Sequence, residues 1–187
     1  MRAGTAVLSP QSLSARRAVA VMLGVGFVAV AAQVSIPLPG TPVPITLQPL
    51  AVLLVGGVLG PALGASTLAL YLALGAAGLP VFTPYGLPGF ARLMGPTGGY
   101  LLSYPVAAFA VGKLAGDGRG YGRLILAAAA GLVLIHLGGV AQLLMLTGSA
   151  QTAVRLGTLP FLLGDLGKLV IAVLVLKRTV SPLRARL

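Results

Sequence analysis

The feature that most constrains this chain is a succession of apolar segments, separated by short stretches rich in proline, glycine or basic residues. A helix needs about 20 residues to cross a bilayer, and the second and third segments are short for a perpendicular crossing. Charged residues make up only 8% of the sequence, against about 25% in soluble domains, so we expect apolar surface to face lipid. We therefore predict an all-α membrane protein, a single integral membrane domain over residues 1–187 with six transmembrane helices. The predicted spans are residues 17–36, 45–60, 62–78, 99–112, 124–146 and 160–176.

The lysines and arginines indicate how these spans are oriented, because basic residues are enriched in cytoplasmic loops. With the N-terminus inside, six crossings leave ten basic residues on the inner side: Arg2, Arg16, Arg17, Lys113, Arg119, Arg123, Lys177, Arg178, Arg184 and Arg186. Only Arg92 and Arg155 lie outside, and Lys168 lies within the last span. We predict a multi-pass protein of the cytoplasmic membrane with both termini in the cytoplasm. This topology explains the net charge of +11 without nucleic acid, for which the chain has no basic patch or motif.

Few residues are available for catalysis. The chain has no cysteine, one histidine and two acidic residues, which excludes thiolate chemistry and leaves little for general acid–base catalysis. We predict no enzyme activity, no metal site and no cofactor. The run GDLGK (164–168) differs from a phosphate-binding loop in its glycine spacing and in the Leu169 that follows it, so ATP hydrolysis is not expected here. His136, alone in the fifth span, is interpreted as structural.

Asp165 and Lys168 are the strongest candidates for a binding site. Ionisable residues inside a membrane segment cost about 2.5–3.5 kcal/mol each at its centre. The two residues are three apart, so they share a helical face near the outer end of the last span. A carboxylate accepts N–H groups and an ammonium donates to oxygen atoms, so the pair suits a polar ligand. The alternative is an internal ion pair that only holds helices together.

Three further residues are candidate ligand contacts. Arg92 stands in a long, apolar outer loop and suits a carboxylate, although it could be an ordinary solvated arginine. Gln48 is a polar residue at the outer end of the second span, where a role in helix packing is the alternative. Tyr100 ends the run GPTGGY (95–100), whose glycines and free helix-start N–H groups suit either an anion or close helix packing.

Small residues recur every four positions along the first span. One stripe contains Ala20 and Gly24, and the other contains Ala18 and Gly26. Such faces let helices approach closely in lipid. They serve either packing within the chain or docking of another membrane subunit, for which Ala18, Ala20 and Gly24 are the candidates.

Several runs together resemble the BioY family. They are QVSIPLP (33–39), TPVPITLQPLAVLL (41–54), GAAGLPVF (75–82), GPTGGY (95–100) and PFLLGDLGK (160–168). Members of this family are biotin-binding S components of energy-coupling factor (ECF) transporters. The resemblance implies a six-helix fold with a vitamin site near the outer face. It also implies a transmembrane coupling subunit, which contacts the first span, and ATPase subunits that hydrolyse ATP, although some members are thought to work alone.

By the same resemblance, Asp165 and Lys168 match the ligand-contacting acid and lysine of the family, and Arg92 lies where the family has a ligand-contacting arginine. The family can place an asparagine after the third span, but this chain contains no asparagine. We hypothesise that Asp165 binds the ureido N–H groups of biotin, Lys168 its carbonyl or Asp165 itself, and Arg92 its carboxylate. The alternatives are an S component for thiamine or riboflavin, which lack that carboxylate, and a structural subunit without a ligand.

Overall fold

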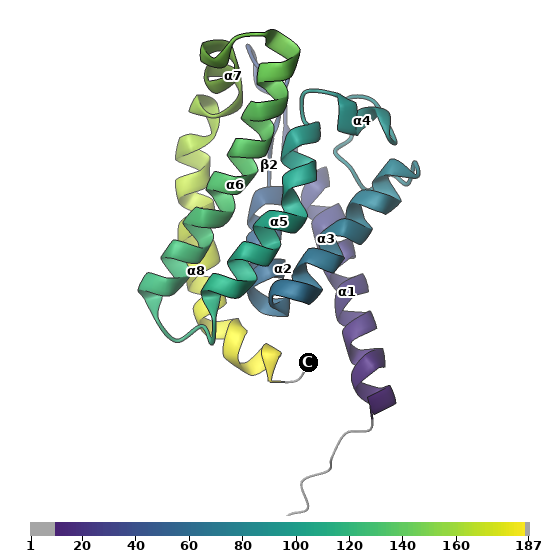
Figure 1. The fold of residues 1–187 in the computed structure, drawn as a ribbon, viewed down its shortest axis with the longest axis vertical. Coiled ribbons are helices and arrows are strands. Elements are labelled where there is room, and N and C mark those ends of the chain that lie inside the picture. The colour runs from purple at the N-terminus through teal and green to yellow at the C-terminus, as the bar shows by residue number, and fades with distance from the viewer. Residues whose placement is uncertain (1–9, 186–187) are drawn as a thin grey trace, which may run out of the picture.

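A computed structural model describes residues 10–185 as a bundle of helices (Figure 1). The long helices are α1 (Pro10–Gln33), α2 (Gln48–Leu59), α3 (Pro61–Ala76), α5 (Gly98–Ala115), α6 (Tyr121–Thr147) and α8 (Leu162–Arg184). The short elements are β1 (Ser35–Ile36), β2 (Ile45–Thr46), α4 (Ala91–Met94), α7 (Ala150–Gly157) and the 3-10 turn η1 (Leu159–Phe161). β1 and β2 pair antiparallel, with Ser35 opposite Thr46.

A helix lies in each of the six ranges predicted as spans, although the bounds differ. The first helix starts earlier, at Pro10, and the last continues to Arg184. By length and composition, three stretches of the described chain are long and apolar enough to cross a membrane: Leu13–Gln33, Tyr121–Thr147 and Ala150–Arg184. Helices α2 and α3 are apolar but shorter, at 12 and 16 residues. These criteria alone therefore indicate three spans, and six remains a prediction.

The polar segment 147–158, which lies between the last two predicted spans, contains α7. Ser149 begins this helix, because its side chain accepts a hydrogen bond from the backbone N–H of Thr152 at 3.3 Å. A serine in this position satisfies one of the free N–H groups of a first helical turn. The proline-rich segment after α1 forms the β1–β2 hairpin.

Close contact between backbones holds α5 in the middle of the bundle. Gly99 of α5 and Gly138 of α6 face each other, so that a Cβ atom added to either would overlap the carbonyl oxygen of the other. Gly56 of α2 lies in the same way against Ala108 of α5. Glycine permits this approach because it has no side chain. The glycine-rich composition therefore reflects tight packing of α5 against both α2 and α6.

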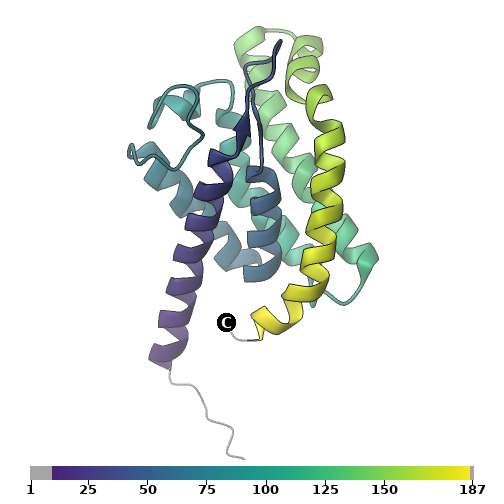
Figure 2. The same cartoon turned by 180° about the vertical axis from the view of Figure 1, so that it is seen from behind.

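The hairpin, α4 and α7 lie at one end of the bundle, and both ends of the described chain lie at the other (Figures 1 and 2). The second end also holds the turn that joins α5 to α6. Most of the basic residues described fall on the elements of this second end: Arg16, Arg17, Lys113, Arg119, Arg123, Lys177, Arg178 and Arg184. Arg92 in α4 and Arg155 in α7 belong to the first end.

Arg184, counted above only among the basic residues of the inner side, joins three segments at this basic end. Its guanidinium donates to the carbonyl oxygens of Gly57 at 2.6 and 3.0 Å, Gly112 at 2.9 Å and Gly116 at 2.5 Å. These carbonyls stand at the C-terminal ends of α2 and α5, where helices lack internal N–H partners and favour positive charge. Arg184 therefore ties the end of α8 to both helices.

The two small-residue stripes of α1 face different surroundings. Gly24 is buried against Thr67 of α3, and Ala20 is half-buried. Ala18 and Gly26 are exposed. The prediction that Gly24 belongs to a docking surface is therefore corrected, because the contact that uses it lies within the chain. The exposed stripe leaves Ala18 available to a partner.

Candidate functional site

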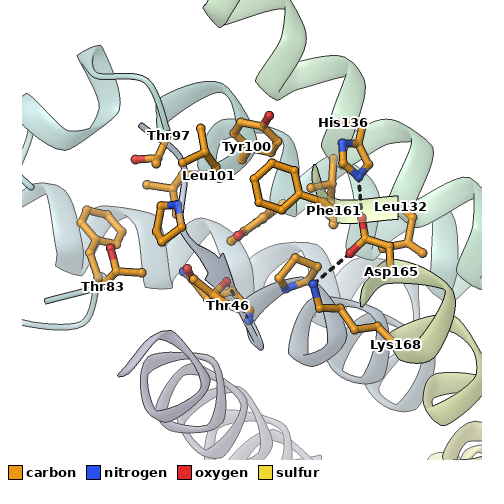
Figure 3. A pocket seen from close by; sticks show the side chains of 17 residues that line it. Thr46, Thr83, Thr97, Tyr100, Leu101, Leu132, His136, Phe161, Asp165 and Lys168 are labelled. Carbon is orange, nitrogen blue, oxygen red and sulfur yellow. Dashed lines mark hydrogen bonds and ion pairs between the residues drawn. The ribbon is translucent and has the colours of Figure 1, made fainter. Parts of the chain in front are cut away.

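A cavity opens between the helices at the end that carries the hairpin and α7, and Figure 3 shows the side chains around it. Its walls come from the hairpin, the start of α2, the segment after α3, and helices α5, α6 and α8. The lining residues are Val43, Pro44, Thr46, Gln48, Pro49, Phe82, Thr83, Thr97, Tyr100, Leu101, Tyr104, Leu132, Ile135, His136, Phe161, Asp165 and Lys168. Most of this lining is apolar or aromatic, with a few polar groups, as is usual for a small-molecule site.

The charged groups of the cavity form one connected cluster. Lys168 Nζ donates to Asp165 Oδ1 at 2.9 Å, and His136 Nε2 lies 2.6 Å from Asp165 Oδ2. In Figure 3 the two basic side chains approach the carboxylate from opposite sides. Asp165 and Lys168 are each only 7% exposed. Asp165 lies in the first turn of α8, where the helix dipole favours a negative charge.

His136 belongs to this cluster, contrary to our interpretation of it as a structural residue without an acidic neighbour. Its Nδ1 atom lies 3.1 Å from the carbonyl oxygen of Gly157, which also accepts the Tyr100 hydroxyl at 2.6 Å. The sequence contains no signal for this contact, because His136 on α6 and Asp165 on α8 are 29 residues apart. Only the packing of α6 against α8 brings them together.

Gln48 and Tyr100 both line the cavity, and each also holds a neighbouring segment. Gln48 Nε2 donates to the Tyr71 hydroxyl at 2.8 Å, and that hydroxyl donates to the carbonyl of Val81 at 2.9 Å. This chain of bonds fixes the segment that follows α3. Tyr100 fixes the end of α7 through Gly157. Both residues therefore have a structural role, and a ligand contact by either stays a prediction.

Arg92 lies beside the cavity rather than in its wall. It is 6% exposed, so it is not a solvated loop residue, and burial lowers the pKa of its guanidinium. Its Nε donates to the Leu87 carbonyl at 2.8 Å, and its Nη atoms donate to the Thr83 hydroxyl at 3.0 Å and carbonyl at 2.8 Å. Three of its five N–H groups thus hold the loop, and Thr83 connects it to the cavity.

A second cavity adjoins the first and includes Arg92. Its lining residues are Pro37, Leu38, Thr41, Pro42, Pro44, Tyr85, Gly86, Leu87, Ala91, Arg92, Gly95, Pro96 and Thr97. Pro44 and Thr97 line both cavities. The predicted site residues therefore fall into two neighbouring groups, with Asp165, Lys168, Gln48 and Tyr100 in the first cavity and Arg92 in the second. Within residues 10–185, no group of three His, Cys, Asp or Glu side chains could hold a metal ion.

Comparison with known proteins decides the family. The model of the BioY family matches residues 6–185. The chain belongs to the BioY family. A probable biotin transporter BioY of Pyrococcus horikoshii is 40% identical over 166 residues, covering 89% of this chain and 97% of its own. The biotin transporter BioY of Thermotoga maritima is 40% identical over 151 residues, covering 81% and 88%.

A solved structure also matches. The S component for biotin from an ECF-type ABC transporter superposes with a TM-score of 0.81 at 27% identity, covering 92% of this chain and 94% of its own. The resemblance noted from the sequence runs is thereby confirmed at the level of the BioY family and its fold. The assignment of the binding-site residues rests on the geometry of the cavity and not on these comparisons.

Proposed function

We propose that this BioY protein captures biotin at the outer face of the cytoplasmic membrane, as the substrate-binding subunit of an ECF transporter. The observation that carries the proposal is the Asp165 carboxylate, held between Lys168 and His136 in the wall of an otherwise apolar cavity. Membership of a family whose relatives include biotin transporters supports the choice of ligand. The protein is a transport subunit rather than an enzyme.

The cluster complements the ureido ring of biotin. Asp165 has one partner on each oxygen atom, and a carboxylate offers about four acceptor positions, so positions remain for two ureido N–H groups. Lys168 uses one of its three donors on Asp165, which leaves donors for the ureido carbonyl. The apolar and aromatic lining suits the thioether ring and the chain. Arg92 keeps two N–H groups for the carboxylate, provided that this end of the ligand reaches the second cavity.

The same proposal includes a single membrane domain with six spanning helices and both termini in the cytoplasm. Two features support it. Both ends of the described chain lie at one end of the bundle (Figures 1 and 2), as an even number of crossings requires. That end also carries most of the basic residues, as expected for the cytoplasmic side. The cavity then opens toward the outer side.

The proposed partners are a transmembrane coupling subunit and separate ATPase subunits, which supply the energy. The exposed stripe of α1, with Ala18, Met22 and Gly26, is the surface that we assign to the coupling subunit. Small residues on a lipid-facing helix allow close approach of a second helix. Ala20, which is half-buried, lies at the edge of this surface.

Binding of labelled biotin to the purified protein tests the proposal. Asp165→Asn removes the carboxylate charge at similar size, and loss of one or more charge-assisted bonds of about 1.5–3 kcal/mol predicts an affinity about 10- to 150-fold weaker. Asp117→Asn is the matched control, because Asp117 is the only other acidic residue of the chain and its side chain is 57% exposed. We expect this control to keep the wild-type affinity.

Competition with other vitamins separates the remaining functions. Displacement of labelled biotin by thiamine or riboflavin at equal or lower concentration would assign the protein to another vitamin. Retention of no vitamin at saturating concentration would favour a structural subunit. Equal affinity of wild type and Asp165→Asn would remove the cluster from the site.

A further inference from the structure

We propose that His136 is a positioning residue of the binding site, a doubly protonated imidazolium that fixes the Asp165 carboxylate, so that biotin capture is linked to one proton. The protonation state follows from the contacts of the free protein. The link to capture also rests on the proposed function. The two parts are tested by different measurements.

The first step concerns Nδ1 of His136. Its neighbour at 3.1 Å is the carbonyl oxygen of Gly157, and a carbonyl oxygen can only accept. Nδ1 therefore carries a hydrogen atom. The Tyr100 hydroxyl donates to the same oxygen at 2.6 Å, so this carbonyl uses both of its lone pairs. The end of α7 thus anchors one side of the imidazole ring.

The second step concerns Nε2, which lies 2.6 Å from Asp165 Oδ2. Two lone pairs would repel each other at this distance, so one proton lies between the atoms. A carboxylic acid holds its proton more weakly than an imidazolium does. The ammonium of Lys168, 2.9 Å from the other carboxylate oxygen, favours the ionised carboxylate further. The shared proton is therefore assigned to His136.

The third step concerns the charge of the cavity. The titratable groups that face His136 are Asp165 and Lys168 from α8 and Tyr100 from α5, and Tyr104 of α5 lines the same cavity. Two cations and one carboxylate leave one net positive charge beside the position proposed for the ureido carbonyl. Loss of the shared proton removes that charge. It also turns a lone pair of His136 toward Asp165, which releases the carboxylate from its orientation.

The single histidine makes the protonation state directly measurable. Because His136 is the only histidine, protein labelled with ¹⁵N-histidine gives imidazole signals from this residue alone. We expect both nitrogens of His136 to carry a proton, because each of them faces an oxygen atom that accepts a hydrogen bond. Asp165→Asn should return the spectrum to that of a neutral ring, and Asp117→Asn should leave it unchanged. An unprotonated Nε2 in the wild type at pH 7.5 would overturn the assignment.

A pH profile of biotin binding tests the link to capture. Over the pH interval in which the ¹⁵N signals show Nε2 losing its proton, we expect the wild-type affinity to fall by up to about tenfold per pH unit, as for one linked proton. His136→Gln, which keeps a side-chain N–H donor, should bind more weakly and lose this slope. A wild-type affinity that stays constant across the interval would overturn the link. Absence of biotin binding at every pH would instead refute the proposed function and leave the ¹⁵N result to decide the protonation.

Discussion

Replacement of Lys168 by methionine separates a ligand-binding cluster from an ion pair that only holds helices together. The change keeps the length and apolar stem of the side chain but removes the ammonium that donates to Asp165 at 2.9 Å. Among the residues that the structure describes, His136 is then the side chain that still contacts the Asp165 carboxylate. A ligand-binding role and a purely structural role both predict a less stable protein for this variant, so stability alone cannot distinguish them. Affinity for biotin can.

The magnitude follows from the bonds that are lost. A hydrogen bond to a charged group contributes about 1.5–3 kcal/mol. In the free protein, Lys168→Met removes one such bond, and this should lower the melting temperature by several degrees, at about 2–4 °C per kcal/mol for a chain of this length. In the complex, it also removes the proposed bond to the ureido carbonyl. The dissociation constant for biotin should therefore rise about 10- to 150-fold.

The assay is equilibrium binding of labelled biotin to the purified variants, with thermal unfolding measured on the same samples. Lys177→Met is the matched control, because Lys177 lies nine residues further along α8, outside both cavities, where it contacts the Arg119 carbonyl and the Tyr121 ring. We expect the control to bind biotin as the wild type does. A folded Lys168→Met protein with unchanged affinity would refute the reasoning and leave the ion pair a structural role.

Two further predictions concern arginines at opposite ends of the bundle. Arg92→Gln removes one proposed charge-assisted bond to the carboxylate of biotin. The ratio of the affinity for biotin to the affinity for its neutral amide should therefore fall by about tenfold or more. A disturbed loop alone would leave this ratio unchanged, and that result would contradict the role. Arg184→Ala removes the contacts with the carbonyls at the ends of α2 and α5, so the free energy of unfolding should fall by about 1.5–3 kcal/mol. Thermal unfolding measures this loss, with Arg178→Ala as the control at an exposed position. The control should change the free energy of unfolding by less than about 0.5 kcal/mol. Equal melting temperatures of the two variants would contradict the role assigned to Arg184.

The sequence predicted the helices well because they follow from local patterns. Apolar length and the glycines and prolines between segments placed a helix in each of the six ranges. It missed α7, because the eight residues Ala150–Gly157 are mostly polar or small and the signal that starts the helix, Ser149, is common in loops. Short polar helices of this kind depend on packing against the rest of the fold.

The site could be predicted only where its members are neighbours in sequence. Asp165 and Lys168 share a face because they are three residues apart, and their contact follows from helical geometry. The contact of His136 with Asp165 depends on how α6 packs on α8, which no local pattern contains. For the same reason, the sequence could not distinguish the face of α1 that holds Gly24 against α3 from the face that carries Ala18 outward.

Pro44 and Thr97 line both cavities, and the proline content of the second cavity has a consequence for the free energy of filling it. Prolines 37, 42, 44 and 96 line the second cavity, and their rings restrict the backbone before any solute arrives. A cavity with walls of this kind loses little conformational freedom on filling, so less of the contact energy is spent on ordering it. On the proposed function, the end of the ligand that reaches Arg92 therefore enters a cavity whose walls are already ordered.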